Sequence, residues 1–130
     1  MKEFLYKFKV PSEAIDMHGH MNNAYYFKIM QDVGFAHSNS VGDTLEAQKE
    51  RGGVWLIREN QATYIKPVFL DDELVIKSWS ERDKRATSTR FFEFYRDDVL
   101  VATAKTTFFY FDTHKNRPVV ISDEVAALYE

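Results

Sequence analysis

Residues Asp16 to Tyr26 hold the side chains with the clearest chemical potential in this sequence. They place an acid, Asp16, before a glycine turn at Gly19 and the expected start of a helix near Asn22. The first N–H groups of a helix have no partner inside it and lie at the positive end of the helix dipole, so they favour an oxygen that develops negative charge. The carbonyl of an acyl ester or thioester is such an oxygen. The segment can therefore hold a carboxylate beside free backbone donors.

The carboxyl group of Asp16 admits a catalytic and a structural interpretation. As a catalytic group it would act as a nucleophile or a general base. As a structural group it would only close an Asx turn or cap the loop, which is the better explanation for an aspartate without the residues that follow here. Asn22 is interpreted mainly as the N-cap of the next helix, because asparagine is among the preferred residues at that position.

His18 and His20, together with Asp16, have a spacing that could also suggest a metal site. Imidazole and carboxylate groups are ordinary metal ligands. Three ligands in one short loop cannot close a structural site unaided, however, and His37 lies far along the expected helix. We therefore expect no metal here, with His20 hydrogen-bonded within the loop and His18 bordering a pocket.

Glu59 is a second acid with possible chemistry. It lies between Ile57 and Gln61 in an expected strand and would be a candidate catalytic acid if it faced a cleft. Strand alternation alone does not tell which face of the strand is wet. The alternative, which we favour, is an ion pair with Arg58 or Lys66.

A strand and a long helix are expected to position the Asp16 segment. Residues 4–10 mostly alternate between apolar and other residues, which is typical of a half-buried strand, and Pro11 closes it. From about residue 22 to 39, apolar residues recur at the spacing of one helix face. Gly34 lies inside this helix at a cost of about 1 kcal/mol relative to alanine, which indicates a close approach to a neighbouring backbone.

The remainder of the sequence predicts a short helix followed by extended segments. Asp43 or Thr44 can cap the short helix, and Gly52 with Gly53 makes a natural stop. A short strand near Val119 and a final helix capped by Ser122 complete the chain. Between these parts, aspartate-containing turns separate segments at spacings suited to antiparallel hairpins; the extended segments are 54–65, 73–81, 87–95 and 99–111.

This order of elements predicts an α+β fold with a curved antiparallel sheet wrapped around one long central helix. A single helix cannot cover both faces of such a sheet. A sheet face rich in phenylalanine indicates that the sheet curls around the helix and is buried further in an oligomer. The residues assigned to that face are Phe91, Phe92, Phe94, Phe108, Phe109 and Phe111.

Length and composition limit the class of protein. The 130 residues are 45% hydrophobic and 15% aromatic, which suits one domain with a substantial core, so residues 1–130 are expected to form a single domain. A net charge of -3 argues against a protein that mainly binds nucleic acid. The absence of cysteine excludes disulfides, thiolate nucleophiles and cysteine-ligated zinc. No apolar run is long enough to cross a bilayer, and we expect a soluble, cytoplasmic protein without a membrane partner.

The element order and two motifs resemble the hot-dog-fold acyl-CoA thioesterases. The first motif consists of Asp16, Gly19-His20, Asn22-Asn23 and Tyr26 at these spacings, and the second is the stretch from Tyr64 to Leu74. The 4-hydroxybenzoyl-CoA thioesterases and the bacterial long-chain acyl-CoA thioesterases are the groups it is most similar to. The helix departs from the family's frequent acidic pair and arginine, which leaves the substrate preference open.

The resemblance implies roles for individual residues. Asp16 would attack the thioester carbonyl or activate a water that does so, and the backbone N–H of Asn23 would polarise the carbonyl oxygen. His18, His20 and Tyr26 would border the substrate. No metal or redox cofactor is implied, since coenzyme A is part of the substrate.

A basic turn at Lys84 and Arg85 falls where related enzymes bind the phosphates of CoA. Arg82 and Arg90 lie nearby in the sequence, and guanidinium and ammonium groups both pair well with phosphate. The alternative is a solvated hairpin tip without a ligand.

The resemblance also implies a homodimer or a homotetramer, with the pocket between subunits. The depth of that pocket would depend on the packing of Phe27, Met30, Phe35 and Trp55. Two other functions stay open. One is a hydratase or dehydratase on the same fold, for which a histidine of the loop with Glu59 is the only support, and the other is a non-catalytic acyl-CoA-binding module.

Overall fold

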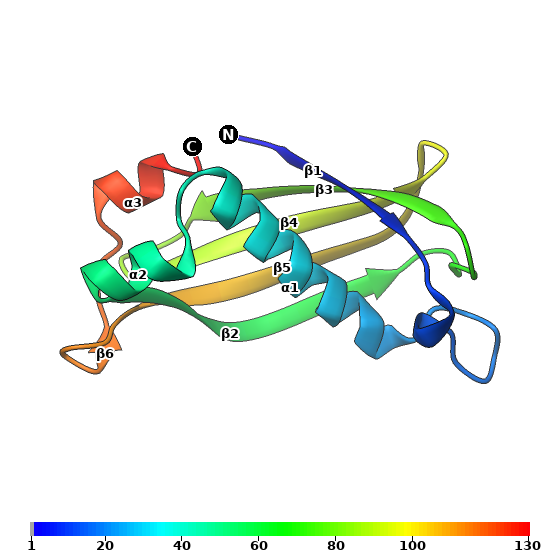
Figure 1. The fold of residues 1–130 in the computed structure, drawn as a ribbon, viewed down its shortest axis with the longest axis horizontal. Helices are drawn as coiled ribbons and strands as arrows, with labels where there is room; N and C mark the ends of the chain where they lie inside the picture. The colour runs from blue at the N-terminus through cyan, green and yellow to red at the C-terminus, as the bar shows by residue number, and fades with distance from the viewer. Residues whose placement is uncertain (1) are drawn as a thin grey trace.

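A long helix lies across a curved antiparallel sheet in the computed structural model, which describes residues 2–130 (Figure 1). The strands are β1 (Phe4–Lys9), β2 (Gly53–Tyr64), β3 (Glu73–Arg82), β4 (Thr87–Arg96), β5 (Val99–Asp112) and β6 (Arg117–Pro118). The helices are the 3-10 turn η1 (Ser12–Ala14), α1 (Asn23–Ser40), α2 (Leu45–Arg51) and α3 (Asp123–Ala127). Among residues 2–130, no helix has the length and apolar character needed to cross a membrane.

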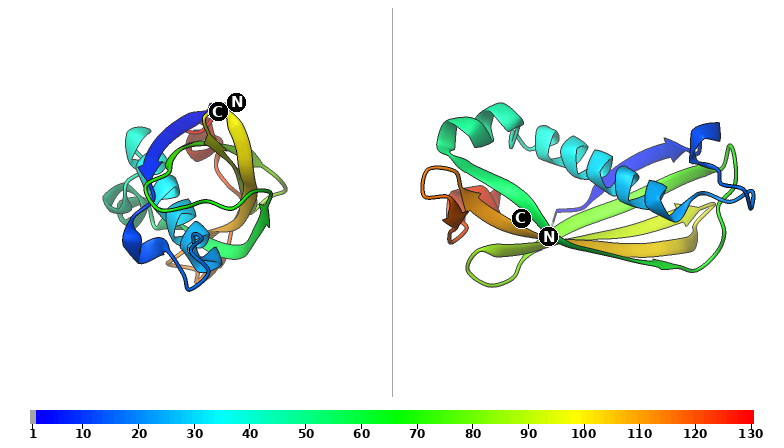
Figure 2. Two further views of the ribbon diagram at one scale, coloured as in Figure 1. Left: turned by 90° about the vertical axis from the view of Figure 1, so that its right-hand side faces the viewer. Right: turned by 90° about the horizontal axis from the view of Figure 1, so that it is seen from below.

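The sheet has the strand order β1-β3-β4-β5-β2, with β6 paired to β5. Every pairing is antiparallel, and β3, β4 and β5 follow one another through local turns. Seen end-on, the strands curl around α1 (Figure 2). β1 and β2 form the two edges, and β2 carries a bulge between Ile57 and Glu59. The predicted wrapping of the sheet around the central helix is confirmed.

Helix α1 begins where the sequence indicated. Asn22 has an extended backbone, and its side-chain oxygen accepts a hydrogen bond from the N–H of Ala24 at 2.8 Å, so Asn22 is the N-cap. The inward face of α1 then packs on the concave side of the sheet, where each fully buried large apolar side chain contributes roughly 1.5–3 kcal/mol. The buried residues on the two sides of this contact are Tyr26, Ile29, Met30 and Val33 from α1, and Leu74, Ile76, Phe92 and Phe94 from the sheet.

The short helices begin at predicted caps, and α2 also ends at the predicted glycine. Thr44 caps α2 through a hydrogen bond from the N–H of Ala47 at 3.1 Å, and Ser122 caps α3. Gly52 ends α2 in the left-handed region, with φ of 73°, where a residue without a side chain is favoured.

Two expectations about packing are wrong. The phenylalanines do not share one face, because neighbours in a strand point to opposite sides: Phe92 is buried under α1, whereas Phe91 stacks on Trp79 on the convex side. Gly34 does not approach a neighbouring backbone either. A Cβ atom at this position would meet only the side-chain Nε of Arg90, at 3.7 Å.

Candidate functional site

The loop after η1 folds Asp16 back on the start of α1. The N–H of Asp16 donates to the carbonyl of His20 at 3.0 Å, and Gly19, with φ of 79°, donates from its N–H to the carbonyl of Asp16 at 3.1 Å. The carboxylate Oδ1 accepts the N–H of His18 at 2.9 Å, which is the Asx turn of the structural interpretation. Asp16 is partly exposed, and within residues 2–130 its second carboxylate oxygen accepts no hydrogen bond.

The first turn of α1 follows this loop directly. Met21 donates its N–H to the carbonyl of Val68 at 2.7 Å, and Asn22 donates to Ala14 at 2.8 Å, so both are used in holding the loop. Within the described chain the N–H of Asn23 has no acceptor. The structure therefore places the Asp16 carboxylate, which has one oxygen without a hydrogen bond, and the free N–H of Asn23 at the same end of the molecule.

The three residues expected to border a substrate have different surroundings. His18 is exposed, and His20 packs edge-on against Phe69 with ring centroids 5.3 Å apart. His20 is hydrogen-bonded within the loop as expected, but through its carbonyl, which accepts the N–H of Asp16 at 3.0 Å; its imidazole makes no hydrogen bond within the described chain. Tyr26 is only 3% exposed and packs in the core between Tyr64 and Phe94. Direct contact of Tyr26 with a substrate would require this packing to open, which favours a structural role for the ring.

A large cavity of about 630 Å³ lies between the second half of α1, helix α2 and the concave side of the sheet. Three of the four residues expected to set pocket depth line it, namely Met30, Phe35 and Trp55, whereas Phe27 packs against the main core. Polar groups from several elements also face the cavity. They are Gln31, Ser38, Gln48, Lys49, Asn60, Ser80, Ser88, Arg90, Thr106, Thr113 and Tyr129.

A buried carboxylate, Asp43, organises one end of the cavity. Its Oδ1 accepts from Arg51 Nη1 at 2.7 Å and its Oδ2 accepts from Trp55 Nε1 at 2.8 Å and from the hydroxyl of Tyr129. Burial alone would lower the pKa of Arg51, but the bond to Asp43 outweighs it and raises that pKa. Burial and the bond to Asp43 likewise raise the pKa of Tyr129.

A second buried group, Arg90, lies beside this carboxylate. Its Nη1 donates to His37 Nδ1 at 2.7 Å and to Ser78 Oγ at 3.2 Å, and its guanidinium lies 5.7 Å from the ring centre of Tyr129. Since arginine can only donate, His37 accepts at Nδ1 and carries its proton on Nε2. Burial and then the charge of Arg90 lower the pKa of His37 to about 4, and burial lowers that of Arg90 to about 10. At neutral pH, His37 is therefore neutral and Arg90 charged.

The basic residues of the β3–β4 turn lie at the other end of the sheet from Asp16. Lys84 and Arg85 are exposed after the end of β3, whereas the Asp16 loop contacts the segment before its start. The length of β3 separates the two ends by about 30 Å. The neighbours named with this turn have other roles, since Arg82 pairs with Asp123 at 3.0 Å and Arg90 is inside the molecule, so the grouping of Arg90 with the turn is wrong.

Glu59 has neither of its expected roles. It is exposed at the bulge of β2, and within residues 2–130 it makes no ion pair with Arg58 or Lys66. The described chain also brings no three histidine or acidic side chains together in a way that could hold a metal ion.

The buried cluster of Asp43, Arg90, His37 and Tyr129 was not found from the sequence. Its members come from distant segments, and no spacing rule joins them. One signal was available for Arg90: it has the same strand parity as Phe92 and Phe94, so a strand with those two residues inside must also point Arg90 inward.

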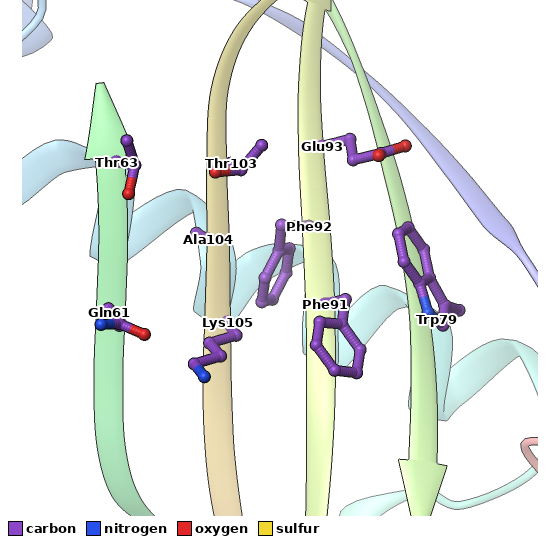
Figure 3. A pocket seen from close by; sticks show the side chains of 9 residues that line it. All are labelled: Gln61, Thr63, Trp79, Phe91, Phe92, Glu93, Thr103, Ala104 and Lys105. Atoms are coloured by element: carbon purple, nitrogen blue, oxygen red, sulfur yellow. The ribbon is translucent and has the colours of Figure 1, made fainter. Parts of the chain in front are cut away.

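A second, shallower hollow of about 270 Å³ lies on the convex side of the sheet (Figure 3). The stacked rings of Trp79 and Phe91 line it, with Lys105 and Gln61 beside them. The one carboxylate in its lining, Glu93, accepts a hydrogen bond from the hydroxyl of Tyr95 at 2.9 Å, and the hollow lies on the opposite side of the sheet from α1. The Asp16 loop and the cavity beneath α1 are therefore the candidate site, although Asp16 and Asn23 do not line that cavity.

Comparison with known proteins gives the family. Residues 10–128 match the model of the Thioesterase-like superfamily, whereas no curated protein matches the chain. A putative oleoyl thioesterase from Lactobacillus plantarum has a TM-score of 0.92 at 16% identity, over 98% of this chain and 50% of that one. A hypothetical protein from Staphylococcus aureus in complex with CoA has a TM-score of 0.88 at 21% identity, over 98% and 81%.

A third solved structure is similar over nearly its whole length. The 1,4-dihydroxy-2-naphthoyl-CoA thioesterase from Synechocystis has a TM-score of 0.88 at 12% identity, with 98% of this chain and 96% of that chain covered. At such low identities these structures show the common fold, which is the expected hot-dog arrangement. The matched family model covers most of the sequence, and its name agrees with a thioester hydrolase. The chain belongs to the Thioesterase-like superfamily.

Proposed function

We propose that this protein is an acyl-CoA thioesterase, which hydrolyses an acyl-CoA to the free acid and CoA. The observation that carries the proposal is that two groups lie at the same end of the molecule: the carboxylate of Asp16, one oxygen of which is free within residues 2–130, and the N–H of Asn23 at the start of α1, which has no acceptor in those residues. Structural neighbours that include a naphthoyl-CoA thioesterase and a CoA complex support CoA esters as the substrate class.

In the proposed mechanism, the N–H of Asn23 donates a hydrogen bond to the thioester oxygen. This bond strengthens as the carbonyl carbon becomes tetrahedral and the oxygen gains negative charge. One such donor is worth on the order of 3 kcal/mol in other enzymes. The free oxygen of Asp16 either attacks the carbonyl carbon or takes a proton from an attacking water, and the N–H of His18 fixes the carboxylate through its other oxygen. In the first route the tetrahedral intermediate expels the CoA thiolate and leaves an anhydride on Asp16, which water hydrolyses to the free acid. In the second route the tetrahedral intermediate expels the thiolate and gives the free acid directly.

We also propose that the site is completed by a second copy of the chain. Within one chain the basic turn at Lys84 and Arg85 is about 30 Å from the Asp16 end, so it could reach the same CoA only from another subunit. Within residues 2–130 the edge strand β2 is unpaired on one side, as expected for an edge that is covered in a homodimer or homotetramer. Leu56 and Ile57 of this strand are exposed and also line the cavity.

Replacing Asp16 by asparagine tests the mechanism. The amide oxygen can still accept the N–H of His18, so the loop keeps its turn, but the nucleophile or base is lost. We expect kcat for acyl-CoA hydrolysis, measured by release of free thiol, to fall by about 100-fold or more with KM little changed. Asp32→Asn, an exposed change on α1, is the matched control and should retain activity.

Three results would contradict the proposal. Asp16→Asn could hydrolyse acyl-CoA as fast as the unchanged protein, which would remove the carboxylate from the mechanism. Hydration of crotonyl-CoA without thiol release would favour the hydratase. Acyl-CoA that binds yet stays intact through long incubation would favour the non-catalytic binding module.

A further inference from the structure

The cavity beneath α1 is positively charged and contains no acid. Its lining includes Lys49 and Arg90 but no aspartate or glutamate, although the sequence has 20 acidic and 17 basic residues. The buried carboxylate nearest to it, Asp43, is engaged by Arg51. Two guanidinium groups and one carboxylate therefore leave one unbalanced positive charge, on Arg90.

The hydrogen bonds of Arg90 leave one edge of its guanidinium free. Both internal acceptors, His37 Nδ1 and Ser78 Oγ, are bonded to Nη1. Nε is buried, and neither Nε nor Nη2 has an acceptor within the described chain. These two nitrogens donate in parallel from one edge of the planar group, which matches the two oxygens of a carboxylate.

Gly34 leaves the free edge uncovered. A Cβ at this position would lie 3.7 Å from Arg90 Nε, so any longer side chain on this face of α1 would fill the space in front of the guanidinium. The glycine costs the helix about 1 kcal/mol relative to alanine, and it lines the cavity together with Arg90.

Keeping Arg90 inside the molecule works against stability. It is 4% exposed and forms no salt bridge within residues 2–130; burial lowers its pKa and outweighs the opposite effect of Asp43, which raises the pKa from a distance. Burial of a charge without a direct partner is strongly unfavourable. A buried charge that faces a cavity and lacks a partner is typical of a binding site, whose ligand supplies the missing opposite charge.

We infer that the cavity binds an organic carboxylate with an apolar body, whose carboxylate pairs with Arg90 while its hydrocarbon lies against Met30 and Phe35. The volume of about 630 Å³ is typical of small-molecule sites. Gly34 is about 16 Å along α1 from Asn23, so the carboxylate held here is not the reacting group of the same chain.

Two sources could supply this carboxylate. One is the far end of a substrate acyl group, that is, the CoA monothioester of a dicarboxylic acid, and this assignment rests on the proposed function. The other is a free carboxylic acid with a hydrocarbon chain, such as the acid released by hydrolysis.

Calorimetric binding of decanoate and of decanamide to the whole protein tests the site without any need for catalysis. We expect decanoate to bind about tenfold more tightly or better, because the amide has the same length but no charge. Arg90→Gln should abolish this preference, whereas Arg58→Gln, which changes an exposed arginine of β2, should keep it. Equal affinities for the two ligands in the unchanged protein, or a preference that survives Arg90→Gln, would overturn the inference.

Gly34→Leu is a second variant that leaves Arg90 in place. Its side chain should fill the cavity and weaken binding of both ligands by about tenfold or more, so the test remains available if Arg90→Gln does not fold. Unchanged decanoate binding by Gly34→Leu would place the ligand elsewhere and overturn the inference.

Hydrolysis of two thioesters distinguishes the sources. If the substrate supplies the carboxylate, kcat/KM for the CoA monothioester of decanedioic acid should exceed that for decanoyl-CoA by about tenfold, and Arg90→Gln should remove the difference. Decanoate binding without a preference between the thioesters supports the free acid as the ligand. If neither thioester is hydrolysed while decanoate binds as expected, the proposed function fails and the carboxylate site stands.

Discussion

The replacement Asp43→Asn should destabilise the fold strongly without changing its shape. The carboxylate is completely buried, with side-chain exposure of 0%, and accepts hydrogen bonds from Arg51, Trp55 and Tyr129. Removing one partner of a buried ion pair costs about 3–5 kcal/mol, because the other charge stays behind unpaired. Arg51 is 24% exposed and can recover part of its hydration, so we expect the lower end, about 3 kcal/mol.

Urea unfolding and calorimetry measure this effect. About 3 kcal/mol should lower Tm by roughly 10 °C for a chain of this size, and the fluorescence of Trp55 should report the altered site directly, since its indole N–H bonds to Asp43. The matched control is Asp32→Asn, which breaks an exposed pair with Lys28 and should change the free energy of unfolding by less than about 0.5 kcal/mol. A loss below about 1 kcal/mol for Asp43→Asn would refute the role of this carboxylate as the centre of the buried network.

Three further predictions concern the basic turn, the buried histidine and the helix cap. Replacing Lys84 and Arg85 by alanine should raise KM for CoA esters more than for pantetheine esters in steady-state assays, and equal increases would exclude phosphate contact. Because His37 has a pKa of about 4 when folded against 6.5 when unfolded, the unfolded state binds more protons between these values, and stability should fall by about 3 kcal/mol as the pH drops through this window. Urea titrations at several pH values would show this slope, and it should be absent in His37→Phe. Asn22→Ala should remove about 1 kcal/mol of stability by calorimetry, and no loss would mean that the cap is replaced by water.

The elements were predictable because their signals are local. Asn22, Thr44 and Ser122 each cap a helix within three residues of the N–H group they accept, and Gly52 ends α2 through its own backbone angle. Such interactions depend on neighbours in the sequence, so spacing rules can find them.

The interior of the cavity was not predictable in the same way. Arg90 meets His37 across 53 positions, and Asp43 meets Tyr129 across 86, so these contacts exist only after the sheet has closed around α1. We expected Arg90 to act with the charged turn at Lys84 and Arg85, because it follows that turn closely in the sequence. Arg90 points inward because side chains alternate along β4, and it lies on the same face as Phe92 and Phe94. Distance to neighbouring charges in the sequence does not indicate this direction.

Tyr129 forms part of the cavity wall from a segment outside the frame of α1 and the main sheet. Its hydroxyl donates to Asp43 and lies 2.9 Å from Ser38 Oγ, and its ring packs edge-on against His37. It follows α3, a helix of only five residues. Substitutions that keep the Tyr129 hydroxyl and the buried Val125 and Ala126 would therefore reshape the chamber while preserving the network around Asp43. Substitutions in this short C-terminal segment are therefore a direct way to alter the size or selectivity of the bound ligand.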